Sequence, residues 1–345
     1  MQRAAFITGL AGPDLAQEEA RFLANARPLG LILFARNCVG HDQIRRLVAD
    51  ALSAIGSDET LVLVDQEGGR VQRLRPPLGR ALPPAAAYAE LYQCGEQQAA
   101  CDAAFGAARL VAKDLRELGI NTNCAPVLDL PVPGSHAIIG DRAYGTSVEQ
   151  VVRLARAVAA GFMAGGVLPV IKHIPGHGRA TKDSHLDLPV VDTDRAELSR
   201  TDFAPFKALA DIPSAMTAHV VFSDIDPSAP ASTSASVIGD VIRGEIGYDG
   251  LLMSDDLGMK ALAGTMRERS ETVIRAGCDV ALHCSGVLAE MEDTAAGVPV
   301  LAGQALRRAE QALAVLKNRE NFDSALAEDR LVAVIADHTG RSESV

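Results

Sequence analysis

Short apolar segments rich in β-branched residues alternate along the chain with longer segments in which apolar residues recur at helical spacing. The short segments are predicted strands and the longer ones predicted helices, because side chains repeat every two residues in a strand and about every 3.6 in a helix. The predicted strands are residues 5–8, 30–34, 60–64, 122–126, 168–172, 214–219, 250–254 and 280–283. The helical segments that follow them are residues 14–25, 42–55, 97–118, 148–165, 199–210, 234–246, 267–276 and 302–316. Eight strands, each followed by a helix, is the count of a closed (β/α)8 barrel.

The whole chain, residues 1–345, is therefore predicted to be one α/β domain, a single (β/α)8 TIM barrel. Residues 4–317 would form the barrel, and residues 318–345 a polar, partly frayed C-terminal extension. Long loops rich in Pro, Gly, Ser and Asp follow the third to sixth strands, at residues 73–87, 130–146, 174–193 and 222–233. Loops that follow strands lie at the carboxyl-terminal face of such a barrel, where active sites are built. We expect the functional site there.

The charge and aromatic content exclude several functions. The 33 Lys and Arg residues face 44 Asp and Glu, which gives a net charge of −11 and argues against binding a phosphate backbone. The chain has no Trp and only 4% aromatic residues, so a long aromatic platform for polymeric sugar is not expected. No run approaches the roughly 20 apolar residues that cross a bilayer. Nucleic acid and membrane are therefore not expected partners.

The cysteines indicate the compartment. They include no C-x-x-C pair, and several stand inside apolar runs, as is typical of buried reduced thiols in a cytoplasmic protein. The six are Cys38, Cys94, Cys101, Cys124, Cys278 and Cys284. We therefore expect a cytoplasmic protein.

The first candidate for chemistry follows the third predicted strand, where Asp65 leaves an apolar run just before Gly68 and Gly69. Such a carboxylate can cap the next turn. An ionised carboxylate also has two acceptor oxygens, which suit two neighbouring hydroxyls of a polyol. Both interpretations stay open for Asp65 by itself.

Histidines follow the fifth predicted strand, at His173, His177 and His185. The first two have the i,i+4 spacing of a helical metal site, but Pro175 and Gly176 between them disfavour a helix. The chain also has neither C-x-x-C nor H-E-x-x-H, so a metal site is not predicted. His177 suits a structural hydrogen bond as well as a ligand contact.

Asp183 and His185 are separated by one residue, so an extended loop would point both side chains the same way. A carboxylate beside an imidazole fixes its tautomer and raises its pKa, which produces an acid that donates a proton near neutrality. Asp-x-His pairs also occur by chance in loops, so the pair by itself does not establish catalysis.

Two adjacent acids, Asp255 and Asp256, follow the seventh predicted strand. Charge at the end of a buried strand is costly unless a partner or a function compensates it. A carboxylate there can attack a sugar carbon or bind a metal, whereas the other acid can cap the next turn, which we assign to Asp256. Side chains alternate along a strand, but both faces of a barrel strand are apolar, so periodicity does not choose between the two.

These segments together resemble glycoside hydrolase family 3, in particular its bacterial β-N-acetylhexosaminidase branch. They occur in the order typical of the family and cover the chain from the third strand to the seventh. The motifs are VDQEGGRVQR at 64–73, IGDRAY at 139–144, KHIPGHG at 172–178, DSH at 183–185 and SDDLGM at 254–259.

The resemblance implies that Asp255 is the nucleophile and that His185 is the proton donor and acceptor, oriented by Asp183. Such enzymes release terminal N-acetylglucosamine with retention at the anomeric carbon, in this branch from soluble peptidoglycan fragments recycled in the cytoplasm, and they need no metal or organic cofactor. The expected partner is thus a small saccharide or muropeptide, and we expect a monomer. The residues implied to hold the terminal sugar are Asp65, Arg73, Arg142, Lys172 and His173.

Three alternatives stay open at this point. Arg73, Arg142 and Lys172 also suit an anion, so phosphate could replace water as acceptor and make the protein a glycosyl phosphorylase. A catalytically inactive, sugar-binding barrel is an alternative of another class, although both catalytic positions are filled. A metal-dependent barrel hydrolase is the third.

Overall fold

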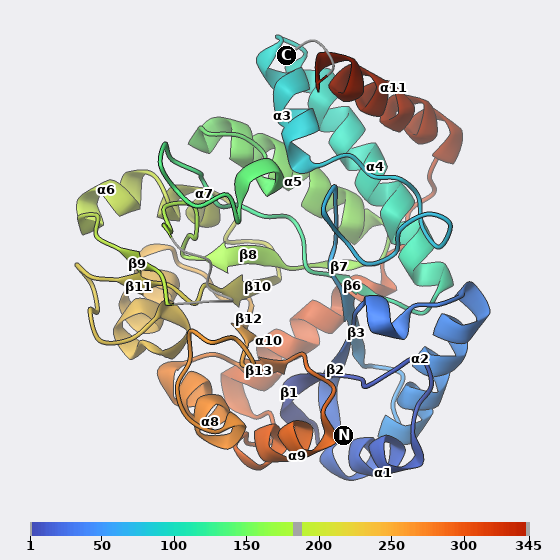
Figure 1. The fold of residues 1–345 in the computed structure, drawn as a ribbon, viewed down its shortest axis with the longest axis vertical. Helices are drawn as coiled ribbons and strands as arrows, with labels where there is room; N and C mark the ends of the chain where they lie inside the picture. The colour runs from blue at the N-terminus through green and yellow to red at the C-terminus, as the bar shows by residue number, and fades with distance from the viewer. Residues whose placement is uncertain (1, 182–187, 343–345) are drawn as a thin grey trace.

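The computed structural model of the protein describes residues 2–181 and 188–342. Within these residues, nine parallel strands form one sheet in the order β7-β6-β3-β2-β1-β13-β12-β10-β8 (Figure 1). Their bounds are Ala4–Gly9 (β1), Pro28–Leu33 (β2), Leu61–Val64 (β3), Thr122–Asn123 (β6), Leu168–Pro169 (β7), Ile171–Ile174 (β8), Ser214–Thr217 (β10), Leu251–Asp256 (β12) and Val280–His283 (β13). Every predicted strand segment overlaps at least one of them.

The fifth predicted strand is divided in two, and this division closes the sheet. β7 pairs with β6, and β8 pairs with β10. These two strands are the ends of the sheet order, yet only Val170 lies between them in the chain. The ends of the sheet therefore meet along one continuous segment, and the predicted α/β barrel is confirmed as a nearly closed ring.

Side chains along each strand alternate between two apolar cores. In β3, Leu61 and Leu63 lie in the core inside the barrel, whereas Val62 and Val64 lie in the core between the sheet and the helices. The alternation follows from the pleat of the strand. Because both faces are covered, the strands read as continuous apolar runs in the sequence.

The outer helices broadly follow the predicted alternation. The segment predicted as one helix at 199–210 contains the end of α6 and all of α7, and α3 was not predicted. The bounds are Gln17–Ala26 (α1), His41–Ile55 (α2), Ala85–Gln93 (α3), Gln97–Glu117 (α4), Val148–Ala164 (α5), Arg195–Arg200 (α6), Phe203–Ala208 (α7), Val237–Glu245 (a π-helix) and Met266–Ala276 (α8). Short strands outside the barrel are Gln66–Gly68 (β4), Val71–Gln72 (β5), Val190–Val191 (β9) and Val221–Phe222 (β11).

The last predicted helix does not join the outer ring. That place belongs to α9 (Leu288–Ala296), which follows β13 and contacts α1 and α8. The helix predicted at 302–316 is α10 (Gly303–Ala314), whose Ala309 and Ala312 are buried in the core inside the barrel. The chain just before α10 pairs with the start of β1, since the Leu301 N–H donates to the Arg3 carbonyl oxygen at 2.7 Å. α10 therefore closes the amino-terminal end of the barrel and lies across the middle of Figure 1.

The C-terminal extension is ordered rather than frayed over most of its length. Ser324–Ser342 forms α11, which packs against α3 and α4 (Figure 1). Its buried residues Ala327, Leu331 and Val334 recur at helical spacing, and Ala327 lies against Gly106 of α4. Local sequence does not mark this buried stripe, because other apolar residues of the same helix, Leu326 and Val332, are exposed.

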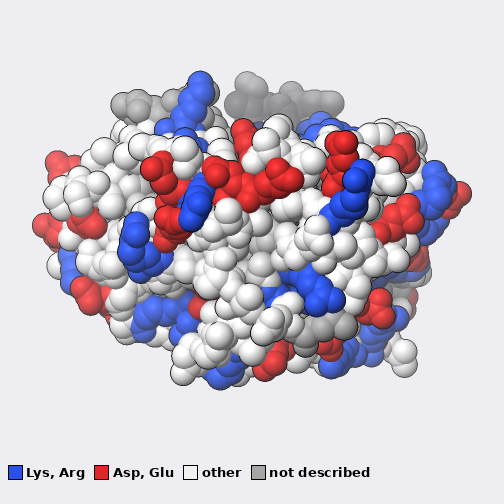
Figure 2. All heavy atoms as spheres, turned by 90° about the horizontal axis from the view of Figure 1, so that it is seen from below, with Lys and Arg blue, Asp and Glu red and all other residues white. Residues whose placement is uncertain are grey.

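The surface agrees with the mixed charge of the sequence. Figure 2 shows one side of the molecule, on which acidic and basic side chains are interspersed. Among the described residues, no helix has the length and apolarity needed to cross a membrane.

Candidate active site

A cavity of about 470 Å³ opens at the carboxyl-terminal ends of the strands, where the site was predicted. The inner faces of three strands continue into it, because side chains two positions apart share a face. Each polar residue lies two positions after an apolar residue of the inner core: Asp65 after Leu63, Lys172 after Val170, and Asp255 after Met253. The six described residues predicted for catalysis or sugar binding all line the cavity: Asp65, Arg73, Arg142, Lys172, His173 and Asp255.

Asp65 is held by two cations, one on each oxygen. Its Oδ1 accepts a hydrogen bond from Lys172 Nζ at 2.9 Å, and its Oδ2 accepts one from Arg73 Nη2 at 2.8 Å. Burial by itself would raise the pKa of Asp65, but Lys172 and Arg73 outweigh burial and hold this pKa well below its ordinary range. Asp65 is therefore a fixed, ionised acceptor at the end of β3.

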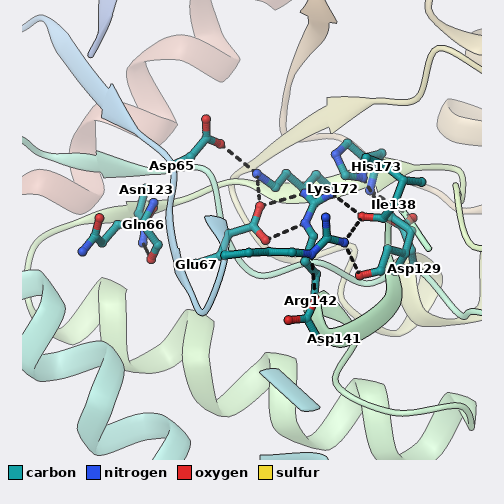
Figure 3. Close-up of polar contacts among 12 residues, drawn as sticks. Asp65, Gln66, Glu67, Asn123, Asp129, Ile138, Asp141, Arg142, Lys172 and His173 are labelled. Carbon is teal, nitrogen blue, oxygen red and sulfur yellow. Dashed lines mark hydrogen bonds and ion pairs between the residues drawn. The ribbon is translucent and has the colours of Figure 1, made fainter. Parts of the chain in front are cut away.

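Glu67 lies behind Asp65 and was not among the predicted site residues. Lys172 Nζ is 2.6 Å from Glu67 Oε1, and the Arg142 guanidinium donates to both Glu67 oxygens at 2.8 Å. Figure 3 shows Lys172 between the two carboxylates and Arg142 beside Glu67. Burial would lower the pKa of Lys172, but Asp65 and Glu67 raise it above its ordinary value. Glu67 thus fixes both cations, and its place two residues after Asp65 was the available signal.

Asp129 orients two of the predicted histidines and was also missed. Its Oδ2 is 2.7 Å from His173 Nδ1, and its Oδ1 accepts the backbone N–H of His177 at 2.7 Å. An ionised carboxylate only accepts, so Nδ1 of His173 carries a proton and Nε2 is the ring nitrogen left for a ligand. Figure 3 shows this pair beside Lys172. The signal for Asp129 was an acid shortly after the fourth predicted strand.

His177 is a buried neutral base rather than an exposed loop residue. Its ring lies 5.5 Å from that of His173, centroid to centroid. Burial, and then the neighbouring His173, lower the pKa of His177 to about 4. The ring is therefore uncharged at neutral pH.

The two adjacent acids of β12 have different surroundings. Asp255 Oδ1 accepts the backbone N–H of Asp256 at 2.8 Å, whereas Asp256 Oδ1 accepts the backbone N–H groups of Gly258 at 2.9 Å and Cys284 at 3.1 Å. Asp256 thus ties two loops together, in agreement with its assigned capping role. Both acids border the cavity.

The backbone beside these acids is held by His219, which sequence reasoning missed. Its Nε2 is 3.0 Å from the carbonyl oxygen of Asp256, and its Nδ1 is 2.6 Å from Ser232 Oγ. A carbonyl oxygen only accepts, so Nε2 donates and Nδ1 accepts from the serine. Burial lowers the pKa of His219, which favours this neutral tautomer.

Phe34 explains how Arg73 is oriented. The Arg73 guanidinium carbon is 5.2 Å from the centroid of the Phe34 ring, and that of Arg36 is 4.8 Å from it. These cation–π contacts hold Arg73 at the cavity wall while it binds Asp65.

Asp183 and His185, the predicted acid–base pair, lie outside the described residues. In the described part of the chain, no group of three or more His, Cys, Asp and Glu side chains is arranged to hold a metal ion.

The chain is similar to known glycosidases over most of its length. The glycosyl hydrolase family 3 N terminal domain matches residues 6–305. A β-hexosaminidase of Alkalilimnicola ehrlichii is 43% identical over 281 residues, which are 80% of this chain and 79% of that protein. The crystal structure of NagZ from Neisseria gonorrhoeae in complex with N-trifluoroacetyl-D-glucosamine matches with a TM-score of 0.86 and 31% identity, over 97% of this chain and 98% of that one.

The chain belongs to glycosyl hydrolase family 3. A second relative, the β-hexosaminidase of Methylococcus capsulatus, is 41% identical over 80% of this chain and 81% of its own length. The family resemblance seen in the motifs, the barrel fold and the glycosidase class are thereby confirmed.

Proposed function

We propose that the protein is a retaining exo-β-N-acetylglucosaminidase that removes terminal β-linked N-acetylglucosamine from soluble peptidoglycan fragments. The observation that carries the proposal is the place of Asp255, which lies near the end of β12 and lines the same cavity as Asp65, Glu67 and Lys172. A cavity of about 470 Å³ has the size of a small-molecule site rather than of a polymer groove. The β-hexosaminidase relatives and the N. gonorrhoeae NagZ structure with its glucosamine derivative support the same substrate class.

In this proposal the terminal sugar is held opposite Asp255. Asp65 accepts from two sugar hydroxyls, since its oxygens are already oriented by Lys172 and Arg73. His173 presents Nε2 because Asp129 holds its other nitrogen. The complete set of sugar-binding residues is Asp65, Arg73, Arg142, Lys172 and His173.

The reaction proceeds in two displacements at the anomeric carbon. A carboxylate oxygen of Asp255 attacks that carbon, the glycosidic bond breaks, and His185, oriented by Asp183, protonates the departing oxygen. His185 then takes a proton from water, whose oxygen attacks the same carbon and releases Asp255. Two inversions give net retention. A histidine acid adds no further negative charge beside Asp255.

Water is favoured over phosphate as the acceptor. Lys172 is shared between Asp65 and Glu67, and Arg142 is bound by both oxygens of Glu67. Their positive charge is thus compensated within the protein, which weakens the attraction that a phosphate acceptor needs. We also propose a cytoplasmic monomer that acts without a metal or organic cofactor.

The test is product analysis with an aryl N-acetyl-β-glucosaminide, with and without phosphate. We expect free β-N-acetylglucosamine as the first product in both cases. A fluorinated substrate that slows ester hydrolysis should leave the sugar on Asp255 in peptide mass mapping. A sugar phosphate would make the protein a phosphorylase, and label on Asp256 or an inverted product would refute the assignment of the nucleophile.

A further inference from the structure

A second hollow, of about 390 Å³, lies at the end of the barrel opposite the active site. It is bordered by the C-terminal parts of α4 and α5 and by the segment between α10 and α11. The helices of a βα barrel run antiparallel to the strands, so the C-terminal ends of the helices lie at the amino-terminal ends of the strands. Figure 1 shows the chain between α10 and α11 passing beside α4.

The hollow is positively charged in a negatively charged protein. Four cations and two acids line it, which leaves a local excess of two positive charges in a chain whose net charge is −11. Within the described residues, none of these six side chains takes part in an ion pair. They are Arg109, Lys113, Arg116, Arg319, Glu117 and Glu320.

Two cations of the hollow, Arg116 and Arg319, repel each other. Burial, and then the charge of Arg319, lower the pKa of Arg116, so these two guanidinium groups repel each other. The Nε of Arg116 is buried, and no group in the described part of the chain accepts its hydrogen. Two like charges that share a partly buried place are a cost that a bound anion would relieve.

The wall of the hollow is already in place. Arg109 Nη2 donates to the carbonyl oxygen of Glu320 at 2.6 Å, and the Arg109 guanidinium carbon is 4.8 Å from the centroid of the Phe322 ring. The Glu320 N–H in turn donates to the Ala164 carbonyl oxygen at 3.0 Å. The segment that carries Arg319 is therefore fixed against α4 and α5, and binding requires little ordering of the chain.

We propose that this hollow binds a small anion that carries a phosphoryl group. Arg116, Arg319 and Lys113 all line the hollow without an ion pair among the described residues, and Arg forks match the oxygens of a phosphate in paired hydrogen bonds. The site involves none of the residues of the active-site cavity.

The test is isothermal titration of the full chain with inorganic pyrophosphate at constant ionic strength. We expect saturable binding at one site, weakened about tenfold by Arg319→Gln and by Lys113→Gln, because each removes one charge-assisted contact. Arg275→Gln on α8, which carries the same charge change outside the hollow, should leave binding unchanged.

Arg116→Gln should weaken pyrophosphate binding more than the other variants do. It also carries a greater risk of misfolding, since the Arg116 Nε is buried. Unchanged glycosidase turnover in all four variants would show that they fold. Three results would each overturn the proposal. The first is pyrophosphate binding that is unchanged in Arg319→Gln and Lys113→Gln, and the second is an equal loss of binding in Arg275→Gln. The third is pyrophosphate binding that is no tighter than the binding of chloride in the same titration.

Discussion

The two ends of the same barrel use one strand face in opposite ways. At the amino-terminal end the inner face is apolar, and Ala309 and Ala312 of α10 close it. At the carboxyl-terminal end the same face continues into Asp65, Lys172 and Asp255. The apolar end buries surface and stabilises the fold, whereas the charged end places polar groups at the rim of a rigid scaffold.

The charged end is stable only because its charges compensate one another. The Lys172 side chain is 3% exposed and that of Glu67 is 8% exposed, and each has an oppositely charged partner within 3 Å. A buried ion pair adds little stability by itself, but removal of one partner leaves a buried charge. We call the charged, carboxyl-terminal end of the barrel the mouth and the apolar, amino-terminal end the floor. Variants at the mouth should change activity, stability or both, according to whether they break an ion pair. Variants at the floor should change stability only.

The largest effect is expected for Asp255→Ala. Loss of the nucleophile should reduce kcat by about 10⁴-fold or more, as for other residues that form a covalent intermediate. The melting temperature should change much less than the activity, since the substitution removes both a charge from the cavity and the hydrogen bond that Asp255 Oδ1 accepts from the Asp256 backbone N–H. Turnover and thermal unfolding measured on the same sample check this, and activity near the wild-type level would exclude Asp255 as the nucleophile.

A somewhat smaller effect is expected for His185→Ala. Turnover of a substrate with a poor leaving group should fall by about 10²–10⁴-fold, the usual range for general acid catalysis. An aryl leaving group that departs without protonation should be affected less in the glycosylation step, and Asp183→Ala should give a weaker form of the same defect. Comparison of kcat for the two substrates checks this. If natural-substrate turnover stays normal, His177 becomes the candidate acid.

Lys172→Met should impair both stability and activity. It leaves Asp65 and Glu67 without their shared cation, which should cost about 3–5 kcal/mol in the free energy of unfolding. Urea unfolding measures this cost. The control is Arg267→Met, whose ion pair with Glu271 is exposed and screened by water, so this substitution should leave the free energy of unfolding nearly unchanged. Equal effects of the two variants would contradict the role of Lys172 at the mouth.

At the floor, Ala312→Leu should destabilise the protein by about 1–3 kcal/mol, because Ala312 is fully buried in the inner core. The matched control on the same helix is Ala314→Leu, at an exposed position, which should be close to neutral. Urea midpoints check both, and kcat at a temperature well below unfolding should be unchanged in each. A selective loss of kcat in Ala312→Leu would break the division between floor and mouth.

The smallest effect is the pH dependence of stability caused by His177. Its pKa is about 4 in the folded protein against an ordinary 6.5, so between these values the unfolded chain binds a proton that the folded protein does not. Stability should therefore be lost as the pH falls from 6.5 to 4. The lowered pKa of His219 acts in the same direction, whereas Asp65 and Asp129 contribute only below about pH 3.8. Melting temperatures across this range should vary less in His177→Asn than in the wild type.

The sequence by itself predicted the barrel, and it named six candidate residues that line one cavity in the structure. Strand and helix periods differ, so apolar spacing located the eight strand segments, and the family motifs placed Asp65, Lys172 and Asp255 at strand ends. Such signals are local, because each depends on residues that are neighbours in the chain.

Tertiary structure decided what local patterns cannot contain. The partners that fix the site, Glu67, Asp129 and His219, act on groups from other segments, as when Asp129 holds His173 across 44 positions of sequence. Only the structure shows that Asp256 Oδ1 accepts backbone N–H groups from Gly258 and Cys284, whereas the choice of Asp255 as nucleophile remains a prediction of the family motif. The place of α10 likewise followed from the closed ring, because an apolar helix face does not specify whether it covers the side of a barrel or its end.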